Sequence, residues 1–183
     1  MYIEEIGRHL AVSSFSELEK SLKLDRGFWN VVSIREPNLR RPQFLTHART
    51  VVEILCEDSE TNDPNVSSRP PRSEDVAAIF EFVNKLPGEP ILVHCLAGLS
   101  RSPAVALAII VQGMIERNSD SIGSKSLVHH SAALLLQIRP QARPNVLFLR
   151  LCLESFMAKS EAEALSAALA NHPALLQNRS KRS

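Results

Sequence analysis

Short apolar runs alternate with segments of helical periodicity along this chain, which predicts strands and helices in turn. Ser14 and Glu17 have the spacing of a capping box, and the apolar positions from Val76 to Leu86 fall on one helical face. The expected strands are residues 2–6, 28–36, 50–56 and 91–93. The expected helices are residues 14–23, the stretch that Ser73 caps, residues 101–117, two segments around 140–144, and 159–170. This alternation favours an α/β fold whose central, mostly parallel sheet of four to five strands is flanked by helices.

The pattern divides the chain into a main domain and a C-terminal extension. Residues 1–158 contain every expected strand, and a chain of 183 residues is long enough for one substantial core. Residues 159–183 hold an Ala-rich helix, which we expect to pack on that core. A basic tail follows with Arg179, Lys181 and Arg182, and we expect it to be disordered.

The composition is that of an ordinary globular protein, with 44% hydrophobic and 22% charged residues. A net charge of +1 argues against a nucleic-acid partner, and three cysteines without paired spacing argue against a secreted disulfide framework. The start of the chain has no signal-peptide pattern, and no apolar run reaches the length of a membrane span. We therefore expect a cytoplasmic monomer that binds neither nucleic acid nor membrane.

The candidate chemistry lies in residues 94–102, His-Cys-Leu-Ala-Gly-Leu-Ser-Arg-Ser, between an expected strand and an apolar helix. Backbone amides of a tight loop and of a helix N-terminus converge on an anion, and the helix dipole adds positive charge. Arg101 presents a planar fork to two phosphate oxygens. Gly98 allows the backbone to approach the ligand closely. The expected phosphate-binding residues are Leu96, Ala97, Gly98, Leu99, Ser100 and Arg101.

Cys95 lies at the bottom of the same loop. A free thiol has a pKa of about 8.5, and helix N-termini or nearby cations lower such values to about 3.5–7.5. The field that binds phosphate therefore also favours a thiolate nucleophile. We expect Ser102 to donate a hydrogen bond to the sulfur, which improves it as a leaving group, and His94 to fix the loop by hydrogen bonds to nearby backbone. A core cysteine alone would not explain an Arg and two Ser in the same turn.

Residues 94–102 resemble the signature of the protein-tyrosine-phosphatase superfamily, and HCLAGLSRSPA resembles its dual-specificity branch. The stretch Ile-Arg-Pro-Gln-Ala-Arg-Pro-Asn at 138–145 resembles a segment late in dual-specificity and bacterial-type phosphatase domains. Independently of this resemblance, Pro140 and Pro144 predict the end of one helix and the start of another. The resemblance implies a protein-tyrosine-phosphatase-like fold, with residues 1–158 as its catalytic domain.

A general acid must protonate the leaving oxygen, which typically contributes about 10²–10⁴ in rate. In the resembling family this acid is an Asp on a loop just after a strand. Asp58 directly follows the expected strand 50–56 and is our choice. Asp63, at 32 residues before Cys95, is the rival, and Glu57 and Glu60 are the remaining candidates. The alternative interpretation is a solvated acidic loop without a catalytic role. Parallel strands place Asp58 and Cys95 at the same edge of the sheet.

The sequence therefore predicts a cysteine-dependent phosphatase for phosphotyrosine, with phosphoserine and phosphothreonine as further substrates, on a phosphorylated protein or a small phosphomonoester. Catalysis is assigned to Cys95, Arg101, Asp58 and Ser102, with no cofactor and no metal, because the guanidinium and the amides replace a cation. A phosphate-binding module without turnover and a rhodanese-like sulfurtransferase are the alternatives. For Cys56 we favour core packing over a reversible disulfide with Cys95.

Overall fold

The computed structural model describes residues 1–61, 69–117 and 123–180, and its centre is a five-stranded sheet. The strand order is β1-β2-β5-β3-β4, in which β1 runs antiparallel to β2 and the other pairings are parallel. The strands are β1 (Tyr2–Ile3), β2 (Arg8–Ser14), β3 (Asn30–Arg35), β4 (Thr50–Leu55) and β5 (Ile91–Cys95). The expected α/β fold with a mostly parallel sheet is confirmed.

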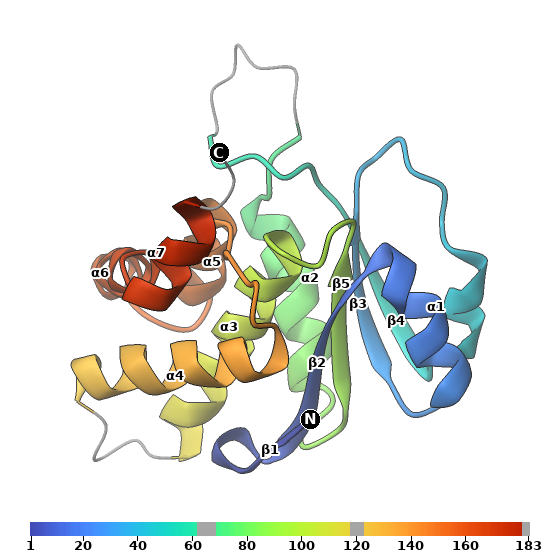
Figure 1. Cartoon of the computed structure of the whole chain (residues 1–183), viewed down its shortest axis with the longest axis horizontal. Coiled ribbons are helices and arrows are strands. Elements are labelled where there is room, and N and C mark those ends of the chain that lie inside the picture. Colours follow the sequence, from blue (N-terminus) through green and yellow to red (C-terminus); the bar gives the residue numbers. More distant parts are fainter. Residues whose placement is uncertain (62–68, 118–122, 181–183) are drawn as a thin grey trace.

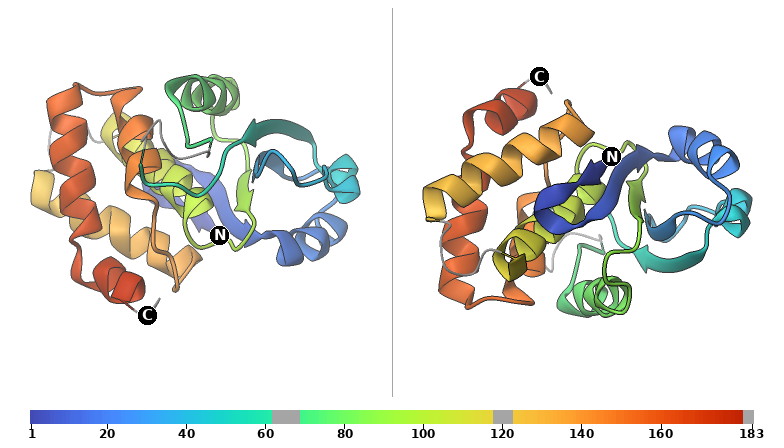
Figure 2. Two further views of the ribbon diagram at one scale, coloured as in Figure 1. Left: turned by 90° about the horizontal axis from the view of Figure 1, so that it is seen from above. Right: turned by 90° about the horizontal axis from the view of Figure 1, so that it is seen from below.

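Helices cover both faces of this sheet, and most of them lie on one side (Figures 1 and 2). On one face, α1 buries Leu18 and Leu22 against Val31 and Leu92 of the sheet. On the other face, α2 and α3 contact the strands, and α4, α5 and α6 pack around α3 and one another. The helices are α1 (Phe15–Leu24), α2 (Ser73–Asn84), α3 (Arg101–Arg117), α4 (Ser124–Ile138), α5 (Val146–Glu154), α6 (Lys159–Ala170) and α7 (Pro173–Ser180).

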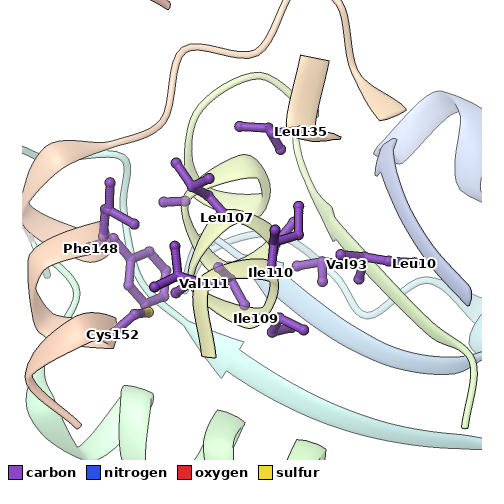
Figure 3. Packing of buried hydrophobic residues seen from close by; sticks show 14 of the residues in the cluster. Leu10, Val93, Leu107, Ile109, Ile110, Val111, Leu135, Phe148 and Cys152 are labelled. Atoms are coloured by element: carbon purple, nitrogen blue, oxygen red, sulfur yellow. The ribbon is translucent and has the colours of Figure 1, made fainter. Parts of the chain in front are cut away.

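Helix α3 runs through the middle of the main core, so its N-terminus has a fixed position. Its residues 101–111 are all buried. Figure 3 shows Leu107 and Val111 facing Phe148 and Cys152 of α5, whereas Ile110 lies toward Val93 of the sheet. Burial of a large aliphatic side chain contributes about 1.5–3 kcal/mol, so this contact fixes α3 firmly against the sheet.

Strand β2 is absent from the sequence prediction, and the expected strand 2–6 is wrong beyond Ile3. Residues 4–6 form a 3-10 turn that ends at Gly7 in the left-handed region (φ 63°), and the chain then returns as β2. The capping box is confirmed: Ser14 Oγ accepts from the Glu17 amide at 3.2 Å, and the Ser14 amide donates to the Glu17 carboxylate at 2.9 Å.

The basic tail is also partly wrong, because Arg179 belongs to α7, a helix anchored by Leu175 at 1% exposure. Lys181 and Arg182 lie outside the described residues. Arg72, not Ser73, occupies the N-cap of α2. No helix in the described part of the chain combines the length and the apolar composition needed to cross a bilayer.

Candidate active site

The candidate site lies where β5 ends and α3 begins. Cys95 is the last residue of β5, and Arg101 is the first residue of α3. Strand β5 pairs in parallel with β2 on one side and β3 on the other, so its carboxyl end opens at one edge of the sheet. The N-terminus of α3 therefore directs its unpaired amides and its partial positive charge at the connecting loop, residues 96–100.

The sulfur of Cys95 accepts two hydrogen bonds inside this loop. The Gly98 amide donates at 3.3 Å and the Ser102 hydroxyl at 3.1 Å, and Cys95 is 2% exposed. Donors aimed at sulfur stabilise the charge of a thiolate. The structure thus places Ser102 where the sequence prediction put it.

Every carbonyl of the connecting loop accepts a hydrogen bond. The donors are the Phe15 amide for Leu96, the Arg139 side chain for Ala97 and Gly98, the Arg143 amide for Leu99, and the Asn145 and Ala104 amides for Ser100, at 2.8–3.2 Å. Among the described residues, no partner is found for the amides of Leu96, Ala97, Leu99 and Ser100. A loop held by its oxygens leaves its N–H groups available to an anion, which is the geometry of a phosphate-binding nest.

Arg101 contributes a buried guanidinium fixed on one side. Its Nη1 donates to the Cys56 carbonyl at 2.6 Å, and its Nη2 donates to the Glu36 carboxylate at 3.2 Å. The residue is 2% exposed, and its Nε has no partner among the described residues. A guanidinium has five N–H donors, so this one keeps donors for an anion while Glu36 and the carbonyl fix its plane. Glu36 follows β3 and was missed from the sequence.

His94 links the site strand to its neighbour. Its Nε2 lies 2.8 Å from Ser33 Oγ on β3, a side chain that the sequence did not indicate. The expected hydrogen bond to nearby backbone is at Cys95, where it opposes the larger effect of burial on the pKa of His94. Burial lowers the pKa of His94 to about 4, so the imidazole is neutral at pH 7. A neutral ring adds no charge to the loop, so it serves to hold β3 and β5 in register beside the site.

Asp58 lies at the rim of the loop. Its Oδ1 accepts from Ser100 Oγ at 2.7 Å and from Asn145 Nδ2 at 2.9 Å, and the residue is exposed. The structure thus brings Asp58 and the loop together at one edge of the sheet. Asp63, the rival acid, lies outside the described residues.

Asn145 is a further residue of the site that the sequence prediction missed. Its Oδ1 caps α5 by accepting from the Phe148 amide at 2.8 Å, and its Nδ2 donates to Asp58 and to the Ser59 carbonyl. Its own amide donates to Ser100. An Asn directly before an apolar run is an N-cap signature, so the cap was predictable, whereas the contacts to the loop were not.

The remaining loop side chains and Cys56 have simpler positions. Leu96 (46% exposed) and Ala97 face solvent at the outer side of the loop. Cys56 is a free thiol at 0% exposure, and burial raises its pKa to about 12, so it packs in the core as a neutral group. The described residues contain no cluster of three His, Cys, Asp or Glu side chains that could hold a metal ion.

Comparison with known proteins supports the fold. No protein-family model and no curated protein matches the sequence. Among solved structures, the chain resembles OH1 from the Orf virus, a tyrosine phosphatase (TM-score 0.55, 18% identity, 82% of this chain and 84% of that one). It also resembles the Yvh1 phosphatase domain from Chaetomium thermophilum (0.53, 20%, 79% and 87%) and the human tyrosine phosphatase-like serine/threonine/tyrosine-interacting protein (0.52, 20%, 80% and 89%). The chain therefore has the α/β fold of the tyrosine and dual-specificity phosphatases.

Proposed function

We propose that this protein is a cysteine-dependent phosphatase that hydrolyses phosphotyrosine, and also phosphoserine and phosphothreonine monoesters. The observation that carries the proposal is the loop itself. At a helix N-terminus, one sulfur with two hydrogen-bond donors meets four amides and a buried guanidinium. Within the described part of the chain, the four amides and the Nε of the guanidinium have no partner. A tetrahedral dianion satisfies all of these donors at once.

In the first step, the Cys95 thiolate attacks phosphorus, so that an S–P bond forms and the P–O ester bond breaks. Arg101 and the loop amides hold the equatorial oxygens, where negative charge is stabilised in the transition state. The electron pair of the broken bond stays on the leaving oxygen, which takes a proton from Asp58. Because Asp58 Oδ1 already accepts two hydrogen bonds, Oδ2 is the atom that carries this proton.

In the second step, water attacks the phosphocysteine. Asp58, now ionised, accepts a proton from the water, the new P–O bond forms, and the S–P bond breaks. The sulfur leaves as a thiolate, and the Ser102 hydroxyl at 3.1 Å stabilises the returning charge. A thiolate nucleophile requires a reducing compartment, which favours the cytoplasm.

Two features support a phosphoprotein or a simple phosphomonoester as the substrate. The loop positions beside Gly98 are Leu96, Ala97, Leu99 and Ser100, so no lysine is present there to meet the further phosphates of a polyphosphorylated inositol. Leu96 and Ala97 instead expose apolar groups at the outer side of the loop, where they suit a phenyl ring or an aliphatic side chain.

The proposal is tested by hydrolysis of an aryl phosphate with the wild type, Cys95→Ser and Asp58→Asn. We expect turnover by the wild type, none by Cys95→Ser with retained binding of a phosphate analogue, and a loss of about 10²–10⁴ in Asp58→Asn. Asp63→Asn tests the rival acid: near-normal turnover there supports Asp58, whereas a loss of this size in Asp63→Asn with near-normal turnover in Asp58→Asn would assign the acid to Asp63. Normal turnover by Cys95→Ser would overturn the mechanism.

A phosphate-binding module without turnover is the second candidate. It is favoured by the place of Asp58, whose carboxylate contacts the rim residue Ser100, while no contact with the Cys95 sulfur is found among the described residues. Binding of phosphate without hydrolysis by the wild type would establish this function. Thiosulfate turnover in place of phosphatase activity would indicate a sulfurtransferase.

A further inference from the structure

The C-terminal helix α7 turns back toward the proposed acid loop. Its Leu175 is 1% exposed and belongs to the main core, so the helix is packed in place. In Figure 2, α7 (red) lies beside the end of α4 and the start of the connection to α5 (orange). Asn178 Nδ2 donates to the carbonyls of Pro140 and Ala142 at 2.8 and 2.9 Å. The helix is therefore tied to the same segment that holds the carbonyls of the phosphate loop.

Arg179 connects this helix to the segment of Asp58. Its Nη2 donates to the Pro144 carbonyl and to Glu60 Oε1, the latter at 2.9 Å. The same Glu60 oxygen accepts from the Val146 amide at 3.1 Å. Glu60 stands two residues after Asp58, so the contact with Arg179 lies within two residues of the proposed acid.

The segment 58–60 is thus held at each of its residues. Asp58 is bound by Ser100 and Asn145, the Ser59 carbonyl by Asn145, and Glu60 by Val146 and Arg179. The Arg179 side chain is 26% exposed and Glu60 is 50% exposed, so this last contact is partly shielded from solvent and not deeply buried. An ion pair of this kind adjusts the position of a loop without deciding whether the domain folds.

We propose that Arg179 is a positioning residue for Asp58 and that α7 is part of the catalytic unit. This inference rests on the proposed phosphatase function. Arg179 holds Glu60 and the connection to α5 together, which keeps the Asp58 carboxyl group at the rim of the loop. Without this contact, the phosphate loop keeps its own hydrogen bonds, but proton donation to the leaving oxygen loses its alignment. General-acid catalysis depends on such alignment within hydrogen-bond reach.

The test is a series of aryl phosphates whose leaving phenols differ in acidity. In Arg179→Ala, we expect kcat/KM for phenyl phosphate to fall by about three- to tenfold, because kcat/KM reports the first step, in which a poor leaving group needs the proton. For a strongly activated nitrophenyl or fluorinated aryl ester, kcat/KM should stay within about twofold. Arg179→Lys, which keeps the charge beside Glu60, should recover part of the loss.

Two further variants separate positioning from a general structural effect. Glu60→Gln should reproduce the leaving-group dependence of Arg179→Ala, and the double variant should add little to either. Arg49→Ala is the matched control, because it removes a surface ion pair with Glu89 (2.5 Å) near the first residue of β4, the opposite end from the acid loop. Its leaving-group dependence should be that of the wild type.

A uniform loss over the whole series, or wild-type dependence in Arg179→Ala, would overturn the inference while leaving the proposed function intact. A wild-type protein that hydrolyses no ester of the series would instead remove the proposed function and this inference with it. The two failures are distinguished because one is seen in the variants and the other in the wild type.

Discussion

Gly98→Ala tests whether close backbone approach fixes the phosphate loop. Gly98 has φ +69°, in the left-handed region that L side chains rarely adopt. A Cβ atom placed there meets the backbone at the junction of β2 and α1, at 2.7 Å from the Ser14 nitrogen and 2.8–2.9 Å from the Ser13 carbonyl carbon and oxygen. These are backbone atoms of a strand inside the sheet, so they cannot turn away as the end of a flexible side chain can.

The expected loss of unfolding free energy has two parts. The left-handed conformation costs a non-glycine residue about 1–2 kcal/mol. The crowding against β2 adds about 1–3 kcal/mol, as for other overpacked sites. The loop relieves part of this strain by moving away from β2, and that movement withdraws the Gly98 amide from the Cys95 sulfur, now at 3.3 Å. Activity should therefore fall together with stability.

Gly27→Ala is the matched control. Gly27 has φ +71°, nearly that of Gly98, but a Cβ atom there has no neighbour within 4 Å among the described residues. Urea unfolding, extrapolated linearly to water, should show a loss of about 1–2 kcal/mol in Gly27→Ala and about 2–5 kcal/mol in Gly98→Ala. Aryl phosphate kinetics should show full activity only in the Gly27 variant. Equal losses of stability, or wild-type kcat in Gly98→Ala, would refute the reasoning.

Three further predictions concern the residues around the loop. Arg101→Lys should lower kcat/KM for an aryl phosphate by about 100-fold, because an ammonium group lacks the planar fork; near-normal steady-state kinetics would contradict this. Asn145→Ala should lower the unfolding free energy by about 1–2 kcal/mol through loss of the α5 cap, and kcat for phenyl phosphate should fall as well. A thermal melt and a kcat that both equal those of the wild type would contradict this. Burial lowers the pKa of His94 from 6.5 to about 4, so between these pH values the unfolded chain binds a proton that the native state does not. Stability should therefore fall by up to about 3 kcal/mol as pH drops from 6.5 to 4, and His94→Gln should flatten that part of the stability curve; parallel curves would exclude His94 as the cause.

The sequence predicts the core of the site because the necessary residues are contiguous. Strand, loop and helix follow one another within residues 91–117, and each is indicated by its own residues. An apolar β-branched run forms β5, a glycine allows the turn, and Pro103 suits the first turn of α3. The positions of Cys95 and Arg101 then follow from local chain geometry alone.

The second set of contacts is not predictable in this way, because its residues meet only after folding. Glu36 reaches Arg101 from the residue after β3, Ser33 reaches His94 from within β3, and Asn145 reaches Asp58 across 87 positions of sequence. Local pattern indicates the helix cap of Asn145, but it indicates none of these contacts with the site. The contacts of Glu36 and Ser33 depend on sheet order, since β3 lies next to β5.

Strand β2 shows a related difficulty. The segment Arg-His-Leu-Ala-Val-Ser-Ser is polar for a strand inside a sheet, and only Leu10 and Val12 mark it as buried. Its serines are compatible with burial because tertiary structure satisfies them: Ser13 donates to the Ser14 carbonyl at 2.8 Å, and Ser14 caps α1. Ser13 and Ser14, which make β2 difficult to predict from the sequence, are therefore also the residues whose backbone lies against Gly98.

The arrangement of the loop carbonyls explains why a short motif needs the whole domain. The amides that we propose as anion donors face inward only while the carbonyls on the other side of the same peptides are held outward. Here the outward contacts come from α1, α3, Arg139 and the segment 143–145, which span most of the chain. The free energy of orienting these dipoles is thus supplied by folding and not by substrate binding, which is what preorganised electrostatic catalysis requires. A peptide with the same nine residues would have the thiol and the guanidinium, but no fixed set of donors to bind phosphate or to hold a thiolate.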